Sequence, residues 1–358
     1  MENRGLIFIP DISGFTRFVN ETEIEHSRYI IQELLEVLIN SNQIGLEISE
    51  IEGDAILFYK YGDAPELKAI YQQVEKMFCE FHRRLIAYEQ RRICRCNACK
   101  SANDLTLKVI THYGEFTGYN VKNFSKLIGK DIILAHQLLK NDIDHHEYWL
   151  VTDGLMKDDL PTDLPQWVAW SSSTKQTDNG KVGFQYTHLG QLKDSIPADT
   201  LPQLEINDKV KMFSVSREID AEINTLFYTM VDFSSRQNWQ EGIKKTDEVS
   251  HTLTQIGTRH RCILEKGHVL MYTSSFSHSP DKIVYSETEA KKKHENLFTF
   301  EKTGENKTRI TVDVYLKKNL IVQTIFNLTM KKKFENSFRQ SLENLAALVK
   351  GGKLPVEV

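Results

Sequence analysis

The stretch LIFIPDISGFT, residues 6–16, joins a short apolar segment to a polar turn. The four apolar residues before Pro10 predict a buried strand, and the residues from Asp11 onward predict a turn that opens a helix. Further along, EIEGDAILF at residues 50–58 predicts a hairpin whose turn contains Asp54. The chain therefore begins with two strand-and-turn segments, and each of them carries an aspartate.

Apolar spacing extends this pattern along the first half of the chain. It predicts helices over about 23–38, 65–90 and 129–141, and strands over 105–116 and 147–155. The second half begins with a strand at 211–219 and a helix at 223–233. Several antiparallel strands follow between 258 and 318. The chain closes with a long helix whose apolar stripe is Phe334, Phe338, Leu342, Leu345 and Val349.

The length of 358 residues corresponds to roughly two domains at about 150 residues each. Residues 196–208 contain two prolines and little periodicity, which is typical of a connection between domains. We therefore expect domains at 1–195 and 209–351, joined by a linker at 196–208, and an α+β fold class for both.

Composition excludes several classes of protein. The hydrophobic fraction of 40% fits a folded chain, and the net charge of -4 gives no general attraction to nucleic acid or anionic membrane. No signal peptide is recognisable and no apolar run approaches the ~18 residues of a membrane span, so stable membrane insertion is not expected. Five cysteines, three of them crowded together, do not resemble a secreted disulfide framework. We expect a cytoplasmic protein.

With these motifs in this order, residues 5–195 resemble the class III nucleotide cyclase domain, a ferredoxin-like α/β sandwich. The resemblance implies that Asp11 and Asp54 hold Mg²⁺ or Mn²⁺, which in that family activates a ribose hydroxyl and clamps a triphosphate. Taken singly, each aspartate is also an ordinary helix-opening or turn residue. The backbone amides expected to face phosphate are those of Ile12, Ser13, Gly14 and Phe15.

The same resemblance assigns base recognition and catalysis to other positions. Glu50 stands where guanylate cyclases accept hydrogen bonds from guanine, although strand alternation equally supplies a solvent-facing glutamate there. Lys126 is the partner base-reading position. Ile133 and Gln137 stand where active cyclases carry an Asn that orients the ribose and an Arg that neutralises charge in the transition state. The metal-binding half of the motif is therefore present and the transition-state half is missing.

Active sites in that family form between two chains, one providing the aspartates and the other providing the Asn and Arg. A homodimer or heterodimer through this domain is therefore implied. A homodimer cannot restore the missing pair, whereas a heterodimer can.

Three cysteines lie within six residues in CRCNAC, at Cys94, Cys96 and Cys99. Thiolates this close, flanked by arginines and lysine, suit Zn²⁺, for which Cys79 or His82 is a candidate fourth ligand. A second CxxC is absent, so free thiols or a redox pair remain alternatives.

From about Val210 to Lys350, the order of strand, short helices, antiparallel strands and a long final helix resembles the START-like, or polyketide-cyclase-like, helix-grip fold. In that fold an antiparallel sheet curves around the helix and encloses an apolar cavity for lipids or other hydrophobic small molecules. The residues expected to line it are Trp239, Met271, Tyr272 and Phe298. The alternative for each of them is an ordinary core position.

These observations favour a regulatory or sensor protein of a family without a characterised function over an enzyme. Its cyclase-like domain is expected to bind nucleotide and metal without turnover, and its second domain a hydrophobic ligand. The alternative is a divergent, metal-dependent nucleotide cyclase that prefers GTP and is regulated by that ligand. No nucleic-acid partner is expected.

Overall fold

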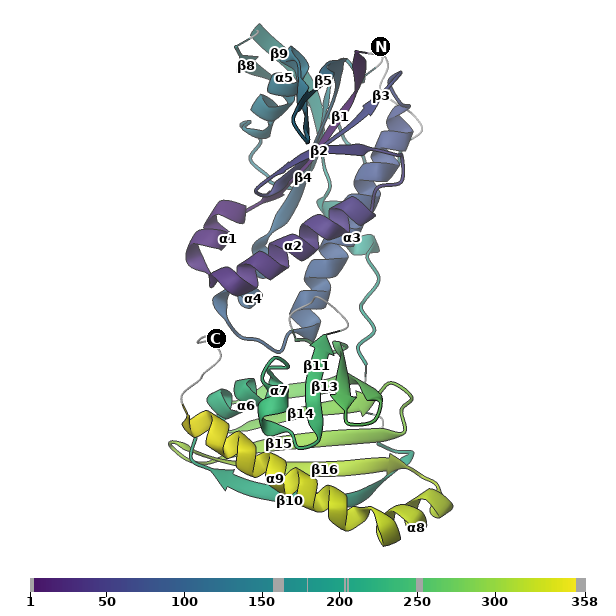
Figure 1. Ribbon diagram of the computed structural model, residues 1–358. Helices are drawn as coiled ribbons and strands as arrows, with labels where there is room; N and C mark the ends of the chain where they lie inside the picture. Colours follow the sequence, from purple (N-terminus) through teal and green to yellow (C-terminus); the bar gives the residue numbers. More distant parts are fainter. Residues whose placement is uncertain are drawn as a thin grey trace. The chain divides into compact units, whose positions relative to one another are not determined.

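Two sheets organise the chain, one in each of two units of the computed structural model (Figure 1). The structure describes residues 3–156, 164–178, 180–202, 204, 206–248 and 254–351. The first unit comprises Met1–Glu89 and Cys96–Asp199, and the second comprises Gln90–Arg95 and Thr200–Val358. Both units combine helices with a sheet, so the α+β class is confirmed. In the predicted linker, residues 203 and 205 lie outside the described residues.

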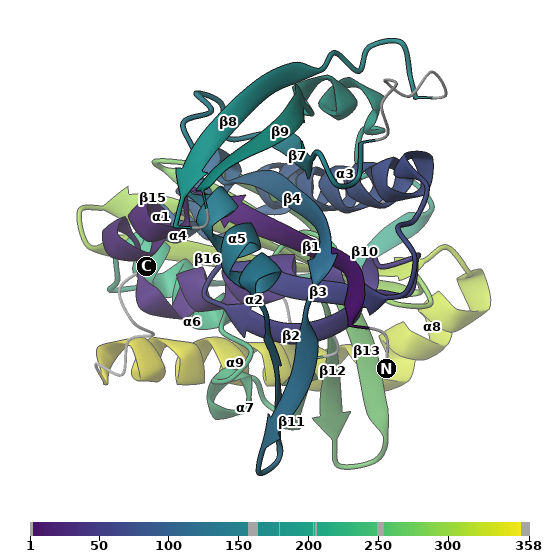
Figure 2. The same cartoon turned by 90° about the horizontal axis from the view of Figure 1, so that it is seen from above.

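The first unit contains a seven-stranded sheet in the order β2-β3-β1-β4-β7-β9-β8. All neighbours run antiparallel except β4 and β7. Figure 2 shows β2 and β8 at the two edges. The strands are β1 (Arg4–Ser13), β2 (Glu47–Glu52), β3 (Ala55–Tyr61), β4 (Thr106–Glu115), β7 (Tyr148–Thr152), β8 (Ser171–Thr177) and β9 (Gly180–His188).

Helices cover both faces of this sheet because its central strands are apolar on both sides. Ile7 and Ile9 of β1 pack in one cluster with Leu138 of α5 (Lys130–Leu139). On the opposite face, Trp149 of β7 contacts Tyr71 of α3 (Leu67–Arg91). Odd-numbered residues of β1, including Asp11, therefore face the α5 side of the sheet.

The remaining elements of the first unit surround the sheet. They are α1 (Phe15–Glu21), α2 (Ile24–Asn40), α4 (Asn97–Ser101), the 3₁₀ turns η1 (Ala102–Asp104) and η2 (Gly190–Ser195), and a separate hairpin of β5 (Thr117–Val121) and β6 (Phe124–Ile128). The hairpin and α4 were not expected.

The second unit contains an antiparallel seven-stranded sheet in the order β10-β16-β15-β14-β13-β12-β11. Its strands are β10 (Lys209–Ile219), β11 (Ile243–Glu248), β12 (Arg259–Leu264), β13 (His268–Ser279), β14 (Lys282–Glu289), β15 (His294–Gly304) and β16 (Lys307–Lys317). Its helices are α6 (Ile223–Val231), α7 (Arg236–Trp239), α8 (Leu320–Thr329) and α9 (Lys331–Lys350).

The long helix α9 lies along this sheet (Figure 1), and Leu342 and Leu345 enter the same core as Val215 and Val312. The predicted stripe of the final helix is therefore confirmed for its central residues. Of the helices in the part of the chain that the structure describes, none combines the length and apolarity that crossing a bilayer requires.

Candidate functional site

Asp11 and Asp54 meet at one corner of the first sheet. Asp11 pairs with Ala55 across β1 and β3, and the amide of Ile12 donates to the carbonyl oxygen of Asp54 at 3.0 Å. This backbone bond closes the β2–β3 turn against the end of β1. Two carboxylates that lie 43 positions apart in sequence are thereby brought next to each other by the sheet.

Burial makes both of these carboxylates hard to ionise. It raises the pKa of Asp11 to about 6, while Lys108 lowers it and the neighbouring Asp54 raises it further. Burial also raises the pKa of Asp54. Lys108 lies opposite Asp11 on β4, with its Nζ 3.6 Å from Asp11 Oδ1 and 3.1 Å from the carbonyl oxygen of Leu139. One ammonium therefore partly neutralises a site that holds two acids.

A cavity of about 680 Å³ begins just beyond Asp11, at Ser13 and Gly14. Gly14 has a φ of 91°, the left-handed conformation that favours glycine, and leads directly into α1. Among the described residues, the buried Ser13 Oγ has no hydrogen-bond partner. Of the four amides expected to face phosphate, that of Ile12 is engaged by Asp54. The cavity is also lined by Arg17, Asp104, Thr106, Asp144, His145, His146, Glu147, His188, Gly190 and Lys193.

The two expected base-reading side chains pair with each other. Lys126 of β6 donates to the Glu50 carboxylate of β2, which also lies 4.0 Å from His136 Nε2 on α5. Beside it on α5, Ile133 is 55% exposed. Gln137 Nε2 donates to Asp178 Oδ2 at 2.7 Å. The structure therefore places no Asn or Arg at these two positions of α5.

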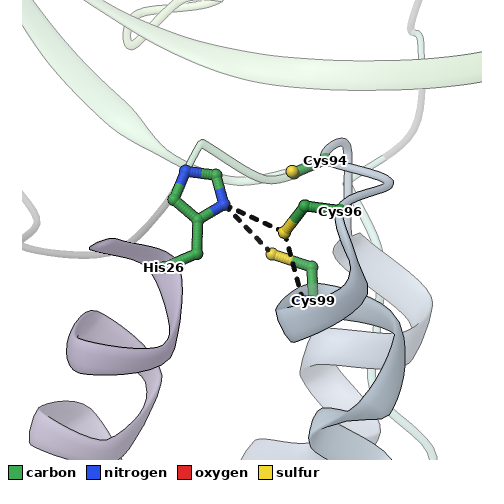
Figure 3. Close-up of side chains that lie close together, drawn as sticks. All are labelled: His26, Cys94, Cys96 and Cys99. Carbon is green, nitrogen blue, oxygen red and sulfur yellow. Dashed lines mark hydrogen bonds between the residues drawn. The ribbon is translucent and has the colours of Figure 1, made fainter. Parts of the chain in front are cut away.

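The cysteine cluster gains a histidine that the sequence analysis missed. The ligand atoms of His26, Cys94, Cys96 and Cys99 all lie within 4.8 Å of one another (Figure 3). His26 comes from the first turn of α2, about 70 residues away in sequence. A histidine at the start of an amphipathic helix gives no local signal of such a role.

The two residues expected as the fourth ligand lie in other surroundings. His82 Nε2 is 3.4 Å from Glu147 Oε1, and its ring packs against Phe78. Cys79 hydrogen-bonds to Ser195. Neither belongs to the described group of ligand atoms, so His26 replaces both as the fourth member.

The expected cavity residues of the second unit do not gather in one place. Trp239 and Phe298 are buried in the main core, Met271 belongs to a separate small cluster with Ile243 and Cys262, and Tyr272 is half-buried. The structure therefore places Trp239 and Phe298 in one core cluster and Met271 in another, and leaves Tyr272 half-buried.

A protein-family model and a curated protein each match part of the chain. Residues 31–148 match the family described as "Protein of unknown function (DUF2652)". A curated, uncharacterised protein of Mycobacterium tuberculosis is 31% identical over 121 residues, which is 34% of this chain. The match spans about half of that relative, 56% of its length.

Solved structures of nucleotide cyclases are similar to about half of the chain. The catalytic core of a rhodopsin-guanylyl cyclase in complex with ATPαS is 13% identical, with a TM-score of 0.37 over 52% of this chain and 96% of that one. A bacterial light-regulated adenylyl cyclase is 11% identical, with a TM-score of 0.39 over 54% and 56%. A dimeric guanylyl cyclase domain from the fungus Blastocladiella emersonii is 13% identical, with a TM-score of 0.34 over 52% and 96%. At such identities and TM-scores, a likeness gives no information on activity.

Proposed function

We propose that the first unit binds a nucleoside triphosphate together with Mg²⁺ or Mn²⁺, and acts as a regulatory sensor rather than as an enzyme. The observation that carries this proposal is the juxtaposition of Asp11 and Asp54 at the end of two neighbouring strands. Hard divalent cations prefer carboxylate oxygens, and a cation placed here would relieve the repulsion between two buried acids.

The surroundings of the aspartates support an anionic ligand beside the metal. The cavity that begins at Ser13 is lined by the cations Arg17 and Lys193, which pair with Asp104 and Glu147 of the same lining, and the Ser13 hydroxyl is available to a phosphate oxygen. The turn at Gly14 brings the backbone close to the same space. Metal and phosphate would then share the site through the carboxylates on one side and these donors on the other.

The surface of α5 supports binding without turnover. A cyclase needs side chains that orient the ribose and stabilise charge developing on the phosphate, and losing such donors raises the barrier by several kcal/mol. Ile133 has no polar group, and Gln137 carries no charge and hydrogen-bonds to Asp178. The alternative function, a divergent cyclase, would draw these groups from a different partner chain. A preference of this cyclase for GTP would require the Glu50 carboxylate to release Lys126 and accept hydrogen bonds from guanine instead.

The proposal for the second unit is a regulatory hydrophobic ligand within a START-like, helix-grip domain. The antiparallel sheet and the long helix α9 support it, but Trp239 and Phe298 fill the core where such a ligand would lie. The ligand would therefore have to displace packed side chains. Mass spectrometry of gently extracted full-length protein tests this, because a co-purified lipid would be seen directly.

The first unit is tested by thermal unfolding with ATP or GTP and Mn²⁺, followed by analysis of the products in the same tubes. We expect stabilisation that needs both nucleotide and metal, with no cyclic nucleotide formed. Asp11→Asn and Asp54→Asn should each abolish it, because they remove the metal ligands. Asp63→Asn is the matched control, since Asp63 is exposed and lies beyond the opposite end of β3.

Two results would contradict the proposal. Cyclic nucleotide in the wild-type tubes, absent in Asp11→Asn, would establish the cyclase alternative. Equal stabilisation of the wild type and both aspartate variants would remove the metal assignment.

A further inference from the structure

His26, Cys94, Cys96 and Cys99 have the distances of a tetrahedral zinc site. Zn–S bonds of about 2.3 Å and Zn–N bonds of about 2.0 Å place a sulfur and a nitrogen ligand about 3.5 Å apart. His26 Nδ1 lies 3.2 Å from Cys96 Sγ and 3.7 Å from Cys99 Sγ. These distances fall on either side of the tetrahedral value, so a zinc ion fits with small movements of side chains.

The backbone around the cluster is arranged to hold thiolates. Cys96 caps α4, and its Sγ accepts a hydrogen bond from the Cys99 amide at 3.4 Å. Glu23, just before α2, accepts from the amides of Asn97 and Ala98 at 3.3 and 3.1 Å. Because Glu23 is fixed to the start of α4, the first turn of α2 holds His26 against the two cysteines. Such supporting bonds orient metal ligands and stabilise negative sulfur.

Burial indicates the kind of site. The three cysteines are buried and His26 is half-buried. Three thiolates and one imidazole fill the four positions of a structural zinc ion and leave none for substrate. Their net charge with zinc is negative, which the neighbouring cations Arg95 and Lys100 offset.

We propose that the protein holds one structural Zn²⁺, bound by Sγ of Cys94, Cys96 and Cys99 and by Nδ1 of His26. This centre is separate from the aspartate site. Its role is to fasten the start of α2 to the loop that carries the cysteines.

Metal analysis of the full-length protein tests this proposal. We expect about one zinc per chain, and a tetrahedral cobalt–thiolate spectrum after exchange into Co²⁺. His26→Ala and Cys96→Ser should each lower zinc occupancy at least about tenfold under a competing chelator. Cys79→Ser is the matched control, because Cys79 lies outside the cluster, and it should keep its zinc.

Three results would overturn the proposal. These are wild-type protein without zinc, a disulfide among the three cysteines in protein purified without oxidant, and unchanged occupancy in His26→Ala. If Cys96→Ser does not fold, the cobalt spectrum of His26→Ala still decides whether the histidine is a ligand.

A second observation concerns α8, which leaves most of its apolar side chains in solvent. Leu320 is 82% and Leu328 is 81% exposed, and only Phe326 of this helix is buried, near Phe213 and Phe334. The exposed apolar residues of α8, the turn after it and the first turn of α9 are Leu320, Ile321, Val322, Ile325, Leu328, Met330 and Phe334. A patch of this kind on a polar protein indicates an interaction surface.

The lysines around α8 indicate which kind of partner its exposed apolar surface would bind. Residues 317–333 contain five lysines, Lys317, Lys318, Lys331, Lys332 and Lys333, and no acidic residue, although the whole chain has a net charge of -4. A short apolar helix with lysines at both ends matches the interface of an anionic bilayer, with the helix lying in the plane of the headgroups. Its ten residues span only about 15 Å and cannot cross the bilayer.

We infer that α8 docks the second unit on an anionic lipid surface. Co-sedimentation with vesicles of equal parts phosphatidylcholine and phosphatidylserine tests this. We expect binding that weakens as salt rises and is absent with phosphatidylcholine alone. Leu320→Ser combined with Leu328→Ser should weaken it at least about tenfold. Both side chains are exposed, so this variant should fold.

Val121→Ser is the matched control, since Val121 is an exposed apolar residue of the first unit, and it should bind as the wild type does. The inference fails if wild-type protein does not bind anionic vesicles, or if the double variant binds equally well. It also fails if the apolar patch instead mediates self-association, seen as a dimer in gel filtration that the double variant abolishes.

Discussion

Arg236 is almost fully buried in the second unit, where it contacts Glu287 and His260. Its Nη2 donates to Glu287 Oε1 at 2.6 Å and its Nη1 lies against His260 Nε2, while the Tyr285 hydroxyl donates to the same Glu287 oxygen at 3.0 Å. Burial by itself raises the pKa of Glu287, but Arg236 and His260 outweigh it, so this pKa lies below its usual value. The Arg236–Glu287 ion pair therefore lies in the interior, and no surface residue can take over its contacts.

We expect Arg236→Met to lower the free energy of unfolding by about 3–5 kcal/mol, because Glu287 is left buried without its counter-ion. Arg217→Met is the control, since the Arg217–Glu343 pair is exposed and should contribute less than about 1 kcal/mol. Urea unfolding of the full-length protein measures both. Equal effects of the two substitutions would contradict the assigned role of the buried pair.

At the scale of elements, α5 shows what a helical pattern can and cannot indicate. Its apolar spacing correctly predicted a helix that packs on the sheet, and Leu134 and Leu138 are in the core. The partners of its outer face are Asp178 for Gln137, from the turn after β8, and Glu50 for His136, from β2, which lie 41 and 86 positions away in sequence. Periodicity carries no information about such contacts.

The helices near the end of the chain also show what an apolar pattern does not predict. The apolar stripe from Phe334 to Val349 predicted one long helix, which is α9, whereas the helix before it, α8, was not predicted. Only the fold shows that most apolar residues of α8 are exposed, because residues of α6, α7 and α9 fill the core beside the sheet.

At the scale of the whole molecule, each unit buries a histidine in the neutral form. Burial lowers the pKa of His82 in the first unit to about 3, helped by Lys193. Burial lowers the pKa of His260 in the second unit to about 4, against the attraction of Glu287. An unfolded histidine has a pKa near 6.5, so between about pH 6.5 and 4 the unfolded chain binds protons that the folded chain does not.

We therefore expect the second unit to lose stability as the pH falls below about 6.5, by about 2 kcal/mol between pH 7 and 5 from His260 alone. His260→Gln should flatten this dependence, whereas His268→Gln, at an exposed position, should not. Urea unfolding at several pH values measures this pH dependence. The unfolding transition of the second unit is the one that Arg236→Met shifts. Equal pH dependence in His260→Gln and wild type would contradict the assignment.

In the first unit, two groups should change the free energy of unfolding in opposite directions as the pH falls. Asp11 has its pKa raised to about 6, so the folded chain takes up a proton there before the unfolded chain does. This favours the folded state as the pH falls and opposes the effect of His82. The metal binding proposed for Asp11 should weaken over the same range, since protons and cations compete for one carboxylate.

The sequence by itself determined the α+β class, most strands and helices, and the choice of the aspartates and cysteines as candidate site residues. Local alternation and helical spacing reflect which side of each element meets the core, and they can be read without knowing the partner. Tertiary structure decided which distant residues meet: Lys108 with Asp11, His26 with the cysteines, and Arg236 with Glu287. It also decided that α8 lies outside the core. These contacts depend on strand order and helix docking, which bring together residues whose separation in sequence leaves no local trace.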